Sequence, residues 1–152
     1  MTTAQITKSN KGFTLIELLV VIGILATLLA ITLIAINPAR QFAQANNTKR
    51  RSDVLQLLNA VHQYAAENQG QFPTGLTASA AAAPIADTGT DICTAIMPTY
   101  ISALPTDPSL NTNPVTDCAT YDTGYTVARD AQGRITVAAP SAELGQTISV
   151  VR

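Results

Sequence analysis

Residues 13–36 read FTLIELLVVIGILATLLAITLIAI, and this stretch decides the fold of the chain. It holds 24 residues with a single charged side chain, Glu17. A helix of that length, rising about 1.5 Å per residue, extends about 36 Å and exceeds the hydrocarbon thickness of a bilayer, about 30 Å. Every face of such a helix would be apolar, unlike an amphipathic surface helix. The stretch therefore predicts a helix that is covered by lipid or by other helices.

The helix is expected to continue to about Asn68, with a different character after Pro38. Pro38 lacks an N–H group and crowds the carbonyl of Ile34, which predicts a kink or a local loosening of the helix near residues 34–37. Residues 37–70 then predict an amphipathic helix, and Gly70 suits the position after its end. The apolar stripe comprises Val54, Leu57, Leu58, Val61, Tyr64 and Ala65, and the polar side comprises Ser52, Asp53, Gln56, Asn59, Gln63 and Glu67.

The last part, residues 71–152, predicts a globular head with a small antiparallel sheet. Residues 74–92 are rich in Ala and Thr and are expected to form an exposed loop, and residues 93–97 one helical turn. Three short runs have strand character, at residues 125–129, 134–138 and 146–151, and the first two are joined by a turn ending in Gly133. The predicted fold class is α+β, with a long N-terminal helix packed on the sheet through residues 50–68.

The two cysteines, Cys93 and Cys118, do not form a CxxC pair, and the single histidine, His62, is distant in sequence, so no zinc site is expected. A disulfide is expected if this part of the chain lies in an oxidising compartment; the alternative is two free thiols. Closing a loop of about 26 residues would stabilise the fold by about 3–4 kcal/mol.

Three interpretations of the N-terminus compete. A secretory signal peptide could end near Ala43-Gln44-Ala45, but its apolar region normally spans about 7–15 residues. A plain signal anchor accounts for the length and leaves Glu17 without a function, although an ionisable group inside hydrocarbon is costly and usually functional. The third interpretation begins from residues 11–17, Lys-Gly-Phe-Thr-Leu-Ile-Glu, which follow a short segment with Lys8 and no acidic residue.

This string resembles the processing site of type IV prepilins and pseudopilins: a basic leader ending in Gly, then Phe, then Glu at the fifth mature position, then a long apolar run. The resemblance implies a leader of residues 1–12, cleavage between Gly12 and Phe13 by a prepilin peptidase, and N-methylation of Phe13 by the same enzyme. It also implies a filament-core helix over residues 13–36.

In this family Glu17 of one subunit would meet the N-terminal amine of its neighbour, because a paired carboxylate costs less than one stranded in lipid. The implied partners are other copies of the chain, the prepilin peptidase, the pilus assembly platform and, before assembly, membrane lipid. The implied location is the cytoplasmic membrane with the N-terminus inside, and then an extracellular filament. Cations after the apolar run outnumber Lys8 and Lys11 before it, so the orientation rests on the resemblance and the expected disulfide.

Two classes of filament subunit fit. Residues 104–108, Leu-Pro-Thr-Asp-Pro, resemble a run found in major pseudopilins, which bind calcium near their C-terminal strands. Asp107, Asp117 and Asp122 could supply carboxylates, but their spacing matches no 12-residue calcium loop, and we expect them to be solvated. The cysteine pair resembles the disulfide of many type IV pilins, although Cys118 lies farther from the C-terminus than in those pilins. A type IV pilus subunit is therefore preferred, with a major pseudopilin second.

Other functions find little support. A formal net charge of −1 and the absence of basic residues interleaved with aromatics predict no specific nucleic-acid partner. The chain has no GxSxG, HExxH or phosphate loop, so neither an enzyme nor a cofactor is expected, and His62 is expected to be structural or exposed. Residues 49–51, Lys-Arg-Arg, predict a solvated helix face, with lipid head groups or a neighbouring subunit as alternatives. A monomeric membrane-anchored extracytoplasmic protein remains the rival from another class.

Overall fold

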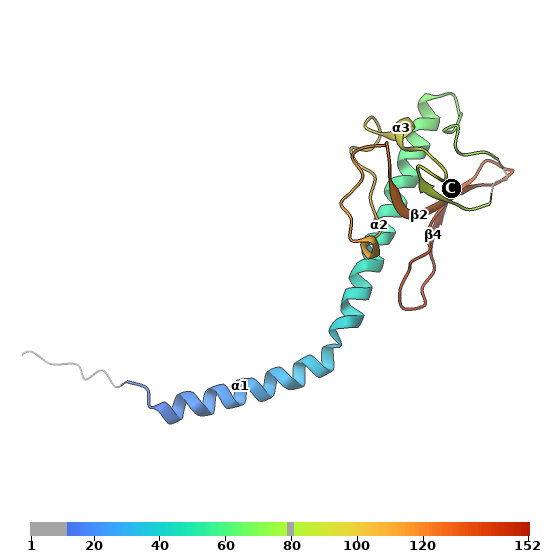
Figure 1. The fold of residues 1–152 in the computed structure, drawn as a ribbon. Helices are drawn as coiled ribbons and strands as arrows, with labels where there is room; N and C mark the ends of the chain where they lie inside the picture. The colour runs from blue at the N-terminus through green and yellow to red at the C-terminus, as the bar shows by residue number, and fades with distance from the viewer. Residues whose placement is uncertain (1–11, 79–80) are drawn as a thin grey trace, which may run out of the picture. The chain divides into compact units, whose positions relative to one another are not determined.

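The computed structural model describes residues 12–78 and 81–152, and its chain divides into two compact units, Met1–Pro38 and Ala39–Arg152. The second unit is called the head below. The helices are α1 (Leu15–Ile36), α2 (Pro38–Glu67) and the single turn α3 (Cys93–Ile96), with a 3-10 turn, η1 (Pro108–Leu110). The strands are β1 (Ala83–Ala86), β2 (Asp122–Arg129), β3 (Ile135–Ala139) and β4 (Ile148–Val151) (Figure 1).

The helical part is two helices and not the continuous helix that the sequence predicts. α1 ends at Ile36, and Asn37 takes a left-handed conformation, with φ 47° and ψ 82°. Asn tolerates this conformation better than most residues. Pro38 then becomes the first residue of α2, where its missing N–H has no helical partner to lose. The kink or loosening expected near residues 34–37 is thus a full interruption of the helix at Asn37.

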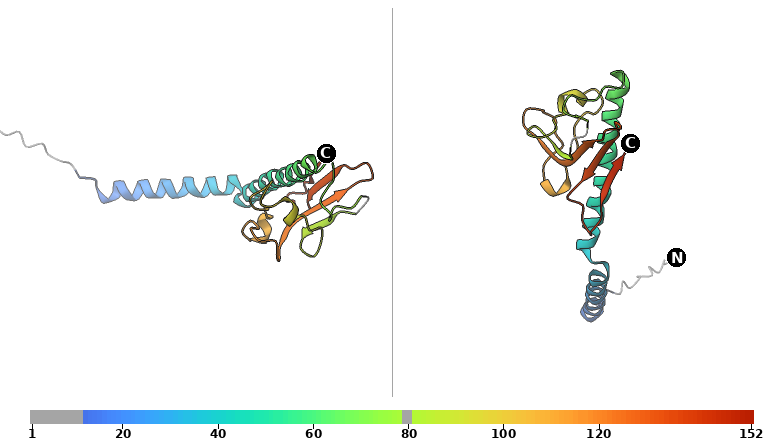
Figure 2. Two further views of the ribbon diagram at one scale, coloured as in Figure 1. Left: turned by 90° about the horizontal axis from the view of Figure 1, so that it is seen from above. Right: turned by 90° about the vertical axis from the view of Figure 1, so that its right-hand side faces the viewer.

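The head is an α+β unit in which α2 packs on a four-stranded antiparallel sheet of order β1-β2-β3-β4. The predicted apolar stripe of α2 is confirmed, since Val54, Leu57, Leu58 and Val61 are all 0% exposed. From the sheet, Tyr125, Ile135 and Val137 are also fully buried and join the same core. Figure 2 shows α2 along one side of the head, with the strands and loops on the other.

The three predicted strands are present with ends shifted by up to three residues, and the turn between β2 and β3 lies where the sequence places it. Gly133 has φ +84°, and its N–H donates to the carbonyl of Asp130. Gly70, with φ +82°, follows the end of α2 as predicted, and its N–H donates to the carbonyl of Ala65.

The prediction of an exposed loop over residues 74–92 is wrong in part. β1 lies in this segment and pairs with β2, from Ala83 opposite Val127 to Ala86 opposite Asp122. Ile85 and Ile92 are fully buried, and Leu76 is nearly so. Cys93 and Cys118 are joined by a disulfide that ties α3 to the loop before β2. The segment therefore contributes to the core, and β1 forms one edge of the sheet.

Candidate processing and assembly site

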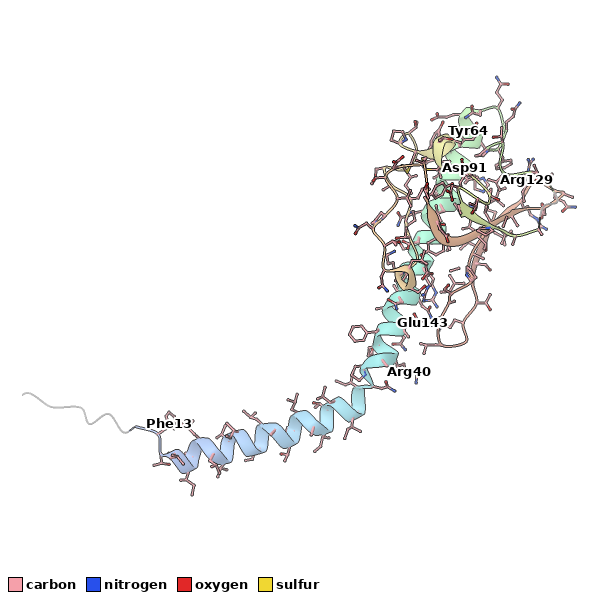
Figure 3. The ribbon with its side chains drawn as sticks, viewed as in Figure 1. Phe13, Arg40, Tyr64, Asp91, Arg129 and Glu143 are labelled. Atoms are coloured by element: carbon pink, nitrogen blue, oxygen red, sulfur yellow. A yellow bond between two sulfur atoms is a disulfide. The ribbon has the colours of Figure 1, made fainter. Side chains whose placement is uncertain are left out.

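The bond between Gly12 and Phe13 lies just before α1. The N-cap residue Thr14 has extended backbone angles, and Phe13 is 86% exposed (Figure 3). Residues 1–11, which include Lys8 and Lys11 of the expected leader, lie outside the described residues. Within the described part, the peptide bond that a prepilin peptidase would cut is exposed and precedes the first helical turn.

Glu17 and Thr14 form a capping box at the start of α1. The backbone N–H of Thr14 donates to Glu17 Oε2 at 2.8 Å, and the Thr14 hydroxyl donates to the same oxygen at 2.7 Å. In return, the N–H of Glu17 donates to Thr14 Oγ1 at 3.3 Å. These bonds satisfy helix N–H groups that have no partner within the helix.

The capping box fixes where the Glu17 carboxylate lies. Glu17 Oε2 accepts from the backbone N–H of Thr14, the residue directly after Phe13. The carboxylate therefore lies close to the position where cleavage would create an amine. Sequence reasoning singled out Glu17 and missed Thr14 as its partner. The pattern Thr-x-x-Glu before an apolar run is a capping-box signal and could have identified it.

α1 presents its whole apolar surface. It has no buried residue, and its large apolar side chains are each more than half exposed. The hydroxyls of Thr27 and Thr32 donate to the carbonyls of Ile24 and Leu29, which satisfies these groups in an apolar environment. Among the described residues, α1 is the one helix long and apolar enough to cross a membrane. An exposed apolar surface of this size is typical of a helix that contacts lipid or other helices.

A second polar site lies where α2 meets the loops of the head, and it corrects the prediction of a solvated face at residues 49–51 for Arg50 alone, since Lys49 and Arg51 are exposed. Arg50 is 1% exposed. Its Nε and Nη2 donate to the two oxygens of Asp107 at 2.8 and 3.0 Å, and its Nη1 donates to Glu143 at 2.7 Å. Arg50, Asp107, Glu143 and Asn47 are called the Arg50 cluster below; Figure 3 labels Glu143 beside α2.

Asn47, on α2, links the Arg50 cluster to the loop between β3 and β4. Its Oδ1 accepts from the N–H of Glu143 at 2.9 Å, and its Nδ2 donates to the carbonyl of the same residue at 2.9 Å. The amide of Asn47 therefore holds the backbone of this loop at two points, while Arg50 holds the side chain. Together they attach α2 to η1 and to the β3–β4 loop.

Asp53 is also buried, at 4% exposed, although the sequence places it on the polar side of α2. Its Oδ2 accepts from the Tyr125 hydroxyl at 2.6 Å and from Lys49 Nζ at 2.7 Å. Burial, together with the hydrogen bond to Asp53, raises the pKa of Tyr125, so the hydroxyl stays protonated and donates. A buried carboxylate without such partners would destabilise the head.

The carboxyl groups of the Arg50 cluster have lowered pKa values. Burial alone would raise the pKa of Asp107, but hydrogen bonds from Arg50 and Ser109 outweigh it. For Glu143, the hydrogen bond from Arg50 and then that from Asn46 lower the pKa. Asp107 is thus a fully buried ion-pair partner and not the solvated loop acid that the sequence suggested.

We expect the head to lose stability in acid because of these two carboxylates. A carboxyl group whose pKa is lower in the folded state than in the unfolded state stabilises the fold at pH values above its unfolded-state pKa, near 4. That stabilisation is lost as the pH falls through the folded-state pKa. Urea unfolding of the full chain at pH values between about 6 and 3 measures this dependence. Asp107→Asn should make the free energy of unfolding less dependent on pH over that range. The exposed Asp117→Asn is the matched control, and an equal change in both variants would contradict the assignment.

The other candidates from the sequence do not gather into a site. Asp117 and Asp122 are exposed, and the described residues hold no group of three side chains suited to a metal ion. His62 is half-buried, and its ring meets that of Phe72 edge to face at 6.0 Å. These residues are assigned no functional role.

The N-terminal part of the chain is similar to a known family of sequences. Residues 7–33 match the model of the prokaryotic N-terminal methylation motif. Searches of curated proteins and of solved structures gave no match. The match covers Gly12, Phe13, Thr14 and Glu17, and such a motif implies processing by a prepilin peptidase. The chain therefore carries a prepilin-type methylation motif, as type IV pilins and pseudopilins do.

Proposed function

We propose that this chain is the structural subunit of a type IV pilus filament and has no catalytic role. The observation that carries the proposal is α1: a wholly uncovered apolar helix, capped by Glu17 through Thr14, directly after an exposed Gly12-Phe13 bond inside the matched motif. Each feature has a use in such a subunit. The exposed bond is cleaved, the new amine of Phe13 is methylated, and the apolar surface is buried against other copies.

In this mechanism α1 lies in the cytoplasmic membrane before assembly, with the head outside. A buried charge is costly unless it is paired. Glu17 is satisfied by Thr14 within one chain, and the amine of a neighbouring Phe13 adds a charged partner when subunits meet. Extraction from lipid is then favoured in the one register that pairs the two charges. The disulfide between Cys93 and Cys118 suits a head that is exposed to an oxidising compartment.

A major pseudopilin is the second candidate, favoured by the segment around Asp107. Leu104 is fully buried and forms an isolated bridge with Val115, and Asp107 caps η1 and pairs with Arg50. The Leu-Pro-Thr-Asp-Pro run therefore has a structural role of its own. The pilus is preferred because the same head carries a disulfide, which that pseudopilin pattern lacks.

The test is the N-terminal sequence and intact mass of the protein from its native membrane and from a sheared surface fraction. We expect a chain that begins at N-methylated Phe13, with 140 residues left after loss of the first 12 and a methyl group adding about 14 Da. A start at Met1 would favour a plain membrane anchor, and a start near Asn46 a secreted soluble protein. Either start would contradict the proposal.

A further inference from the structure

The side of α2 that faces away from the core has an unusual composition. Between residues 54 and 66 the helix holds no Asp, Glu, Lys or Arg. Apart from the adjacent pair Leu55 and Gln56, the exposed positions follow one another three or four residues apart, so they share one face of the helix. This α2 amide face comprises Ser52, Leu55, Gln56, Asn59, Gln63 and Ala66.

Charged groups border the α2 amide face. Arg51 lies at one end and donates to Gln146, and Glu67 lies at the other and accepts from the hydroxyl of Tyr100. Arg152 reaches Asn59 at 3.4 Å from the strand side. A hollow of about 220 Å³ opens beside the face, lined by Gln56, Asn59, Ala60, Gln63, Tyr100 and Ile101.

This arrangement is typical of a protein interface and atypical of a solvated helix. Interfaces lose charged residues at their centre and keep them at the rim, whereas exposed helix faces ordinarily carry many charges of both signs. Amide side chains both donate and accept hydrogen bonds, so a face of Gln and Asn can pair with a copy of itself. Leu55, at 43% exposed, adds an apolar contact near the Arg51 end of the face.

The two ends of the face have opposite charge, which indicates how a second copy would lie. Arg51 and Glu67 are separated by 16 positions, or about 24 Å along a helix. A copy displaced along the helix axis brings Glu67 of one chain toward Arg51 of the next. Contacts of this kind between different ends of one surface are heterologous, and they produce open helical arrays when the rotation does not close.

We propose that the α2 amide face is a lateral contact between copies of this chain, buried when the filament forms. The inference rests on the filament function proposed above. It adds to that function a contact made by the head, separate from the packing of α1. Burying a lysine at the centre of this contact would leave an unpaired charge, so insertion of positive charge is the sharpest perturbation.

The test combines charge insertion with photo-crosslinking in cells that express the full chain. Gln56→Lys combined with Gln63→Lys should leave processing and disulfide formation intact and lower the yield of sheared fibre about tenfold or more. Gln132→Lys, on the exposed turn between β2 and β3, is the matched control and should keep wild-type yield. A photo-reactive residue at position 63 should give ladders of crosslinked subunits in fibres, and one at position 132 should not.

The outcomes separate the two proposals. If the wild-type chain gives no fibre, the filament function fails and this contact fails with it. If fibres form, wild-type yield from the double lysine variant without ladders from position 63 overturns the contact and leaves the filament function standing. Crosslinks from position 63 to a different protein, or to lipid, in place of a second subunit would also overturn it.

Discussion

Replacing Arg50 with alanine should destabilise the head by about 3–5 kcal/mol. The guanidinium is 1% exposed and is the cation that pairs with both Asp107 and Glu143. Its loss leaves Asp107 buried, since that residue is also 1% exposed, with the Ser109 hydroxyl and N–H as remaining donors. A buried carboxylate that has lost its counter-charge costs more than the lost contact itself. Urea unfolding of the full chain in detergent, followed by circular dichroism, measures the effect.

Two further variants make the prediction specific. Arg51→Ala removes the neighbouring exposed arginine, which donates to Gln146, and should change the free energy of unfolding by less than about 1 kcal/mol. Arg50→Lys keeps the charge and loses the paired donors that match a carboxylate, so its effect should lie between those of the two alanine variants. Equal destabilisation by Arg50→Ala and Arg51→Ala would contradict the role given to the Arg50 cluster.

Periodicity predicted the fold well where the pattern was long. The apolar run predicts α1, the stripe from Val54 to Ala65 predicts the packed side of α2, and short runs of strand character on either side of a turn predict β2 and β3. The same stripe extended toward the N-terminus passes through Arg50 and Asn47, which the structure buries. The sequence predicts a solvated Arg50 because the partners that make its burial favourable lie 57 and 93 residues away. Sequence spacing does not show such partners.

Two other features depended on tertiary context. β1 is short, rich in Ala and contains Pro84, so local propensity favours a loop; pairing with β2 and burial of Ile85 make it a strand. At Pro38 the sequence predicts a kink or a local loosening within one helix, whereas in the structure Pro38 begins a second helix. The methylation motif was predictable because Gly12, Phe13 and Glu17 lie within a few residues of one another.

Replacing Glu17 with alanine should leave the chain processed and membrane-inserted and lower the yield of sheared fibre about tenfold or more, because the neighbouring amine would lack its counter-charge. Processing and insertion depend on residues 1–13 and on the apolar run, which the variant keeps. N-terminal sequencing, membrane fractionation and immunoblots of sheared material measure the three properties. Wild-type fibre from this variant would contradict the role of Glu17 in setting the register.

Alanine removes the charge and the helix cap together, so a second pair of variants is needed to separate them. Glu17→Gln keeps an acceptor for the N–H of Thr14, since Gln also completes a capping box, but it carries no charge. Thr14→Val keeps the charge and removes the hydroxyl that donates to Glu17 and accepts from its N–H. If pairing with the amine drives assembly, Glu17→Gln should lose fibre as Glu17→Ala does, and Thr14→Val should retain more. The reverse order would assign Glu17 to local helix capping, and the charge would then have no part in selecting the register.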